Sequence, residues 1–233
     1  MKFEKTEVLG FEHALRGMRN PLESWSKSDS GICYNFDEEL GEQPVFAIGF
    51  NDMQLAKKLV KAGSEHRKFL RQIFISVDIT APLYFWKEFD TYKIGTVANS
   101  TSTMHKLSST PITTDCFEIS DFENLEDVNN IATRGDWSSS EEYDSLSDFW
   151  ERVIDVCEGL RQKYNETKDK RYWKELIRLL PESWLQKRTI TMNYENVFNM
   201  YLQRQNHKLS EWSKDFKEWA ESLPYFKELF LEQ

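Results

Sequence analysis

The amino-acid sequence predicts an α+β fold, in which a mostly antiparallel sheet is covered by helices and the C-terminal portion is helical. Three observations support this prediction. Residues 71–80 and 188–192 alternate apolar or β-branched residues with polar ones, as half-buried strands do. The second of these strands leads directly into a helix. Apolar residues also recur at helical spacing along residues 146–160 and, as aromatics, in the tail from Leu209 to Leu231.

The composition limits the class of protein. With 233 residues, of which 39% are hydrophobic and 14% aromatic, the chain can bury a sizeable core, and we expect residues 1–233 to form a single domain. No apolar run approaches the roughly 20 residues that a membrane span needs, and the first ten residues lack the apolar stretch of a signal peptide. We therefore expect a cytoplasmic protein with no membrane partner.

The net charge of −9 is concentrated in one segment. Residues 115–148 contain eleven acidic residues and one basic residue, Arg134, so this segment carries −10 and the rest of the chain +1. A nearly neutral body tolerates an anionic ligand but has no basic stripe for nucleic acid, and we expect no nucleic-acid partner. The region from about 109 to 144 is predicted to be an acidic loop or insertion. A solvated excursion is the favoured interpretation, and a partner-binding segment is the alternative.

Cysteine and histidine are sparse and scattered. The three cysteines, Cys33, Cys116 and Cys157, are odd in number and lack metal-ligand spacing, which favours reduced structural thiols. The four histidines are equally dispersed. We therefore expect no metal site.

The N-terminal third is predicted from local patterns. Residues 1–10 are expected to form a strand and residues 11–18 a short helix, whereas the turn formers in residues 19–46 predict an irregular excursion. A helix over residues 52–62 follows, with Asn51 as its N-cap and Gly63 as its stop. In the strand over residues 71–80, four residues are expected to point to one face: Ile73, Ile75, Val77 and Ile79.

A second group of elements is predicted after this strand. Residues 80–83 are expected to open a helix with Pro82 in its first turn, where proline is tolerated, and Phe85, Phe89 and Tyr92 form its buried stripe. After Gly95 a hydroxyl-rich strand or loop follows, which can hold a phosphate or simply face solvent. A long helix is predicted from about residue 145, starting with a capping box between residues 145 and 148, and a shorter helix from about residue 171 to 180.

The junction near residue 193 carries most of the polar pattern. Asn193 ends the strand and is expected to cap a helix that begins at Tyr194, since its side-chain oxygen can accept a hydrogen bond from a free amide of the first turn. Val197 and Tyr201 form an apolar stripe on that helix. Another face carries an amide row with an arginine beside it: Asn196, Asn199, Gln203 and Arg204. Such a face suits a uracil-like edge and a phosphate, and a solvated helix surface is the alternative.

This junction resembles the C-terminal part of the flavin-dependent thymidylate synthases. That family has a Leu-Pro, a strand ending in Thr-x-Asn, and a helix with Asn and Arg. The corresponding residues lie here in the same register without a gap: Leu180, Pro181, Thr191, Asn193, Asn199 and Arg204. The resemblance implies that Asn193 and Asn199 lie near a flavin and that Arg204 lies near a nucleotide.

Residues 80–108 resemble the same family in register but not in its signature. Where the family has Arg-His-Arg, this chain has Thr91, Tyr92 and Lys93. The resemblance implies that Tyr92 stacks on a ring and that Lys93 holds a phosphate. Four further positions correspond to family contacts with flavin or nucleotide. Thr101 stands at a serine beside the nucleotide, Thr103 at an arginine, Glu88 at a glutamine that touches nucleotide, and Gln72 at a histidine that meets flavin. His66 matches the histidine of the family's Gly-His-Glu-Ser segment, and the resemblance implies that it too binds the cofactor.

The resemblance implies a function and an assembly. Family members are homotetramers with active sites between subunits, and they pass a methylene group from methylenetetrahydrofolate to dUMP with FAD and NADPH. Because threonine does not replace the planar fork of arginine, we expect weak FAD binding and little ordinary thymidylate synthesis, with an altered modification at C5 of a pyrimidine nucleotide as one outcome. The alternative is a non-catalytic descendant that binds a nucleotide or a partner.

Overall fold

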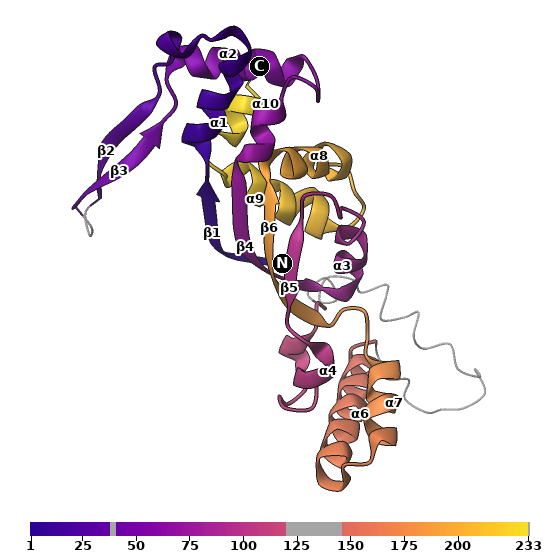
Figure 1. The fold of residues 1–233 in the computed structure, drawn as a ribbon. Coiled ribbons are helices and arrows are strands. Elements are labelled where there is room, and N and C mark those ends of the chain that lie inside the picture. The colour runs from indigo at the N-terminus through magenta and orange to yellow at the C-terminus, as the bar shows by residue number, and fades with distance from the viewer. Residues whose placement is uncertain (38–40, 120–145, 233) are drawn as a thin grey trace.

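The computed structural model describes residues 1–37, 41–119 and 146–232. Its centre is an antiparallel four-stranded sheet with the strand order β1-β4-β6-β5 (Figure 1). The strands are β1 (Lys2–Leu9), β4 (Phe74–Pro82), β5 (Val97–Ser100) and β6 (Leu185–Asn193). The predicted α+β class with a mostly antiparallel sheet is confirmed. None of the helices in these described ranges is both long and apolar enough to cross a membrane.

The side chains of strand β4 alternate between a buried and a partly exposed face of the sheet. Ile75, Val77 and Ile79 are buried, as predicted, while Ser76 and Asp78 between them are partly exposed. The strand begins at Phe74 rather than at residue 71, because residues 68–72 form a 3-10 helix, η3 (Lys68–Gln72). Alternation along a strand points successive side chains to opposite faces, so the buried face is the one that the helices cover.

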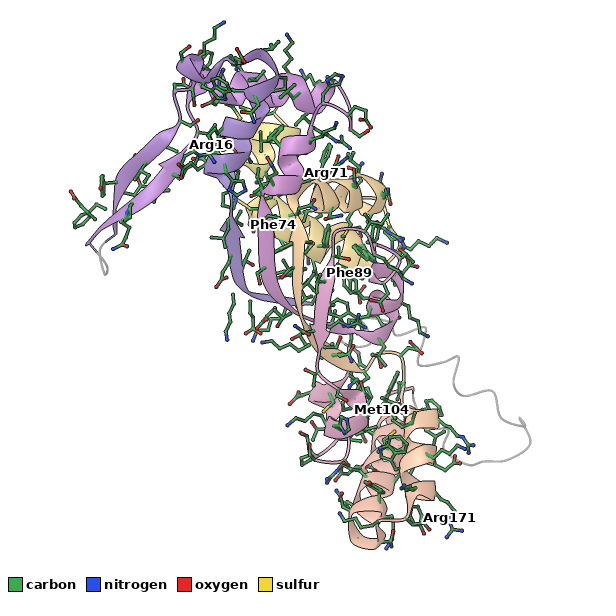
Figure 2. The ribbon with its side chains drawn as sticks, viewed as in Figure 1. Arg16, Arg71, Phe74, Phe89, Met104 and Arg171 are labelled. Carbon is green, nitrogen blue, oxygen red and sulfur yellow. The ribbon has the colours of Figure 1, made fainter. Side chains whose placement is uncertain are left out.

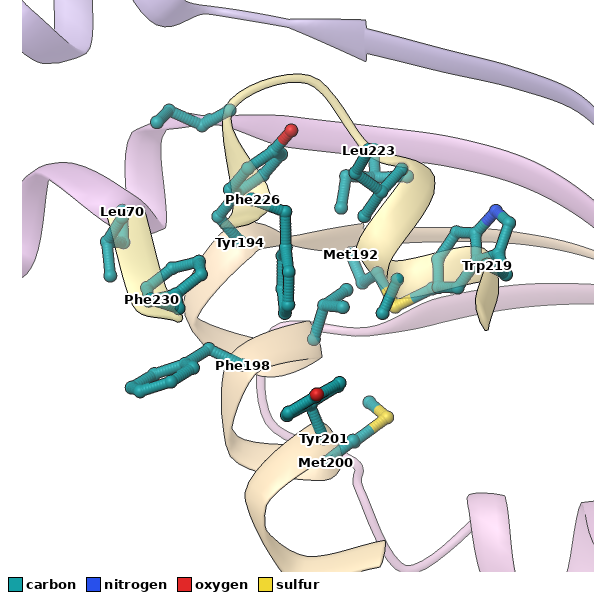
Figure 3. Close-up of a cluster of buried hydrophobic side chains, with 14 of the residues drawn as sticks. Leu70, Met192, Tyr194, Phe198, Met200, Tyr201, Trp219, Leu223, Phe226 and Phe230 are labelled. Atoms are coloured by element: carbon teal, nitrogen blue, oxygen red, sulfur yellow. The ribbon is translucent and has the colours of Figure 1, made fainter. Parts of the chain in front are cut away.

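Helices from the first half and the C-terminal part of the chain form the main core on that face. They are α1 (Phe11–Met18), α2 (Phe50–Lys61), α3 (Leu83–Phe89), α8 (Tyr194–Arg204), a π-helical turn (Glu211–Phe216), α9 (Lys217–Ser222) and α10 (Phe226–Phe230). The predicted helical tail is confirmed, and Trp212, Phe216 and Trp219 are buried in this core. Figure 3 shows α8 side chains packed against the C-terminal helices, and the rings of Phe198 and Phe230 stack with centroids 4.1 Å apart.

Helices α2 and α3 begin at other residues than predicted. Helix α2 starts at Phe50, and its first-turn amides at Asn51 and Asp52 donate to the Asp29 carboxylate at 2.8 and 3.1 Å. Asn51 is therefore not the N-cap, because a side chain 22 residues upstream satisfies these amides. Helix α3 begins at Leu83, since β4 continues through Pro82. Gly63 has φ +102° just beyond α2, as its role as a stop requires.

A β-hairpin replaces most of the irregular excursion that was predicted for residues 19–46. Two 3-10 turns, Asn20–Leu22 and Trp25–Lys27, precede the antiparallel strands β2 (Gly31–Asp37) and β3 (Gly41–Ala47). The hairpin projects from the body beside α1 and α2 (Figure 1). Ile32, Tyr34 and Phe36 alternate along β2 and are 66–77% exposed. The alternation was visible in the sequence, but the turn formers around it concealed the strands.

Helices α6 (Leu146–Thr167) and α7 (Lys170–Leu179) form a separate hairpin at the far end of the sheet (Figure 1). Together with α4 (Thr103–Lys106) and a 3-10 turn (Thr114–Cys116), they enclose a second, smaller hydrophobic cluster. Its buried members are Leu107, Ile112, Phe117, Ile154, Cys157 and Leu176. Phe149 of the predicted α6 stripe is instead 55% exposed. Burial raises the pKa of the Cys157 thiol. The predicted capping box at Ser145 and residues 120–145 of the acidic segment lie outside the described residues.

Candidate functional site

The β6–α8 junction has the predicted cap. Asn193 Oδ1 accepts a hydrogen bond from the Asn196 amide at 3.0 Å, and the Asn193 amide donates to Asn196 Oδ1 at 3.2 Å. These reciprocal bonds form a capping box in which asparagine takes the place of glutamate or glutamine. Asn196 Nδ2 also donates to the carbonyl of Ile94 at 2.8 Å. The start of α8 is therefore tied to the loop that follows α3.

A pocket of about 610 Å³ lies at this junction, within the size range of small-molecule sites. It is formed by three segments: the region around η3, the loop after α3, and the first three turns of α8. Its lining residues are Ser64, Arg67, Arg71, Thr91, Tyr92, Lys93, Ile94, Gly95, Asn193, Glu195, Asn196, Asn199 and Gln203. The pocket lining thus includes the whole amide row of α8 and the three residues at the Arg-His-Arg positions.

Two arginines flank a buried carboxylate at one side of the pocket. Glu195 is 6% exposed, and its Oε1 accepts from Arg67 Nε at 3.0 Å while its Oε2 accepts from Arg71 Nε. Burial opposes ionisation of Glu195, but hydrogen bonds from Arg71 and Arg67 outweigh it and lower its pKa. Glu195 is therefore a carboxylate at neutral pH. The charged lining residues, Arg67, Arg71, Lys93 and Glu195, carry a net charge of +2.

The loop after α3 supplies the opposite side. Gly95 has φ +78°, and a Cβ atom there would lie 2.9 Å from Asn196 Oδ1 and 3.0 Å from Asn193 Nδ2, so the close approach of this loop to α8 requires glycine. The Tyr92 hydroxyl donates to Gln203 Oε1 at 3.0 Å. Tyr92, which was predicted to lie in the helical stripe, follows the end of α3 and presents its ring to the pocket.

Arg204 and Glu88 form a layer behind Tyr92. Arg204 Nε donates to the Tyr92 hydroxyl at 2.8 Å, and Arg204 Nη1 lies 2.5 Å from Glu88 Oε2. The Arg204 guanidinium also lies 5.5 Å from the centroid of the Tyr92 ring and 5.3 Å from that of Trp212. Arg204 balances the charge of Glu88, so a ligand does not meet an unpaired carboxylate there. Neither residue lines the pocket.

The structure groups some of the candidate residues and separates others. Asn193, Asn199, Tyr92 and Lys93 line the pocket. Gln72 is directed toward α1, where its side-chain oxygen would lie 3.0 Å from a Cβ atom at Gly17, and His66 is exposed outside the lining. Gln72 and His66, for which flavin contacts were expected, therefore do not line this pocket.

Thr101 and Thr103 lie at the opposite end of the sheet. The Thr101 amide donates to the carbonyl of Lys187 at 2.8 Å, and Gln186 Nε2 donates to Thr103 Oγ1 at 3.3 Å. Asn193 lies six residues beyond Lys187, which corresponds to about 20 Å along β6. Figure 2 shows this separation, with Arg71 at the α8 end and Met104 near α4. The two threonines are therefore not part of the pocket of their own chain.

Arg67, Arg71 and Glu195 were not predicted from the sequence. Antiparallel pairing places Phe74 opposite Asn193, so the residues just before β4 meet those just after β6. Once this register is known, the i,i+4 spacing of the two arginines and the nearby glutamate predict the cluster. The signal was present in the sequence, but it depended on which strands pair. In the described part of the chain, no cluster of three His, Cys, Asp or Glu side chains could hold a metal ion.

Comparisons with known proteins support the fold. Neither a family model nor a curated protein sequence matches this chain. Among solved structures, it is similar to the flavin-dependent thymidylate synthase of Helicobacter pylori complexed with FAD and dUMP, with a TM-score of 0.64 and 14% identity over 100% of this chain and 99% of that chain. A second structure of that enzyme with FAD and dUMP, at 2.31 Å, gives a TM-score of 0.63 at the same identity. The chain therefore has a fold like that of these thymidylate synthases.

Proposed function

We propose that this protein binds FAD and a pyrimidine nucleotide of the dUMP type, and that it catalyses a flavin-dependent modification at C5 of the pyrimidine. The observation that carries the proposal is the pocket at the β6–α8 junction, which combines three cationic side chains with a row of amides. The full-length similarity to structures holding FAD and dUMP supports the same ligands. Methylenetetrahydrofolate and NADPH are the proposed co-substrates.

The residues of the pocket fit a flavin nucleotide. The net charge of +2 suits a phosphate-bearing ligand, the Tyr92 ring offers a stacking surface, and the side chains of Asn193, Asn196 and Asn199 offer donors and acceptors for a ring edge. Sequence alone predicted weak FAD binding, since the Arg-His-Arg positions hold a single cation. Arg67 and Arg71 add two guanidiniums from another segment, which brings further positive charge to the pocket.

The pocket side chains would bind and orient the ligands, and the cofactor would supply the redox chemistry. A bound flavin would supply electron transfer, as cofactors carry the hard step in such enzymes. Asn193 and Asn196 would fix a ring edge, and Tyr92, oriented by Arg204, would limit access of water to that ring. Glu195 accepts hydrogen bonds from two arginines, and these bonds lower the pKa of Glu195. Glu195 is therefore a poor general base.

A non-catalytic nucleotide-binding protein is the second candidate. The lining residues include neither histidine nor cysteine, and their single carboxylate is engaged by Arg67 and Arg71. A binding protein needs no group that transfers protons, so this lining also suits the alternative. The two functions differ in turnover and not in ligand.

The absorbance of the purified protein is the first test. We expect flavin bands after purification or after reconstitution with FAD, and binding of dUMP. A protein that remains colourless after incubation with FAD and removal of the unbound cofactor contradicts the enzyme proposal.

Turnover is measured with FAD, NADPH, methylenetetrahydrofolate and dUMP, together with growth rescue of a thymidine-requiring strain. We expect consumption of NADPH that depends on the nucleotide, with low thymidylate formation. Binding of nucleotide without any turnover supports the non-catalytic candidate.

A further inference from the structure

We propose that Arg67 and Arg71 form a phosphate-binding site in the pocket, and that Glu195 is the positioning residue that holds both guanidiniums. This inference rests on the proposed function and deepens it, because it assigns the end of the pocket that receives the phosphate group of the ligand. The residues from which the family resemblance was drawn do not include these three.

The geometry leaves donors available on both arginines. Arg67 uses Nε on Glu195 and Nη2 on Asn199 Oδ1, at 3.0 and 3.1 Å, and its guanidinium lies 5.1 Å from the centroid of the Phe198 ring. Arg71 bonds Glu195 through Nε, and its side chain is 49% exposed. Each guanidinium has five N–H donors, so the Nη groups that these contacts do not use remain for a ligand.

The charges favour a phosphate over a neutral group. Two guanidiniums beside one carboxylate carry +1, and Lys93 on the opposite loop brings the lining to +2. A phosphate monoester carries about −1.5 to −2 at pH 7. Two N–H donors of one guanidinium can bond two oxygens of the same phosphate group. The site should therefore bind a phosphate group in preference to an anion that cannot accept such paired hydrogen bonds.

The buried carboxylate of Glu195 orients both arginines. A buried carboxylate is costly unless it is paired, and here both of its oxygens accept from an arginine. The pairing fixes two long side chains that would otherwise repel each other and sample many rotamers. The ligand therefore meets donors that are already oriented, which reduces the ordering cost of binding.

Pairs of ligands with and without phosphate test the proposal on the full-length protein; dUMP and deoxyuridine differ by phosphate alone, whereas riboflavin lacks both the diphosphate and the adenosine of FAD. FAD is compared with riboflavin and dUMP with deoxyuridine, by fluorescence or calorimetric titration. We expect Arg71→Ala to weaken binding of the phosphate-bearing member of one pair by about tenfold or more, with little effect on its phosphate-free partner. The affected pair identifies the source of the phosphate. Arg71→Lys is expected to recover part of the affinity.

The control is Lys68→Ala, which removes a positive charge from the same 3-10 helix but outside the pocket lining. Glu195→Gln tests the positioning role. It makes the pocket more positive, so a purely electrostatic site should bind phosphate more tightly, whereas loss of the oriented donors should weaken phosphate-dependent binding; unfolding stability is followed separately. Equal losses for both members of each pair, or no difference between Arg71→Ala and Lys68→Ala, would overturn the inference. Failure of the wild-type protein to bind any of the four ligands instead overturns the proposed function.

Discussion

Asn193 serves both the fold and the candidate site. Its side chain caps α8, and the same residue lines the pocket. A capping residue is held in place by the helix that it starts, so its orientation is independent of any ligand. The capping interaction therefore positions an amide group for recognition before a ligand arrives.

Replacement of Asn193 by alanine should destabilise the protein by about 1 kcal/mol, because the amide of Asn196 loses its acceptor. Asn193→Asp keeps the acceptor and should retain most of the stability. Urea unfolding of the three proteins measures the difference. If alanine and aspartate have equal effects, the cap contributes nothing to stability.

Arg204→Ala should weaken dUMP binding. The sequence predicted that Arg204 contacts the nucleotide; in the structure it lies behind the pocket lining and holds the Tyr92 hydroxyl at the pocket wall, so its loss should disturb that wall. Titration of dUMP against the wild type and the variant measures the effect. Glu88→Gln is the companion variant, since it leaves Arg204 in place without its carboxylate partner. Equal affinity of wild type and Arg204→Ala would remove Arg204 from the site.

At the scale of elements, the carboxylate of Glu158 links the α6–α7 hairpin to the segment after α4. Glu158 on α6 accepts hydrogen bonds from Arg161 Nε at 2.7 Å and from the amide of Ile112 at 2.8 Å. Arg161 Nη1 also donates to the carbonyl of Ser108 at 3.2 Å. Hydrogen bonds from Arg161, opposed by desolvation and aided by the Ile112 amide, lower the pKa of Glu158 to about 2. This group connects α6 to the segment that follows α4.

The lowered pKa predicts a pH dependence of stability. The contribution of Glu158 is present above the pKa of an unfolded glutamate, about 4.3, and is lost as the pH falls toward 2. The wild type should therefore be more stable than Glu158→Gln at pH 7, and the difference should shrink between pH 4.5 and 2. Thermal unfolding of both proteins across this range measures it. A difference that stays constant with pH contradicts the assignment.

At the scale of the whole molecule, the projecting β2–β3 hairpin has an exposed apolar face. Two-stranded hairpins are marginally stable alone in water, and this one exposes Ile32, Tyr34 and Phe36 on one face. Cross-strand partners add Pro44 and Phe46 to the same face. A face of this kind is suited to contact with another copy of the chain, in keeping with the homotetramer expected from the sequence.

We expect light scattering at micromolar concentration to show a homo-oligomer, with a tetramer as the expected form. Replacing both Tyr34 and Phe36 by serine should shift the mass toward smaller species, because it removes apolar area from the hairpin. Arg171→Ala, which changes an exposed residue on α7, is the control. A monomeric mass for the wild type contradicts the prediction.

The sequence by itself determined the elements whose signals are local. The alternation in β4, the cap at Asn193, the stripe of Val197 and Tyr201, and the amide row of α8 all depend on backbone geometry over a few residues. These features were predicted in their correct places. The β2–β3 hairpin and the start of α2 were not, because turn residues obscured the first and a distant carboxylate, Asp29, caps the second.

Tertiary structure decided which side chains share the candidate site. Arg67 and Glu195 are 128 residues apart in the chain, and only the antiparallel pairing of β4 with β6 brings them together. Thr101 bonds Lys187 of β6, and Lys187 lies about 20 Å along this strand from Asn193 at the pocket. Local patterns specify backbone conformation and the face on which a residue lies, whereas charge pairing across a site depends on strand register. That register is set by packing of the whole sheet.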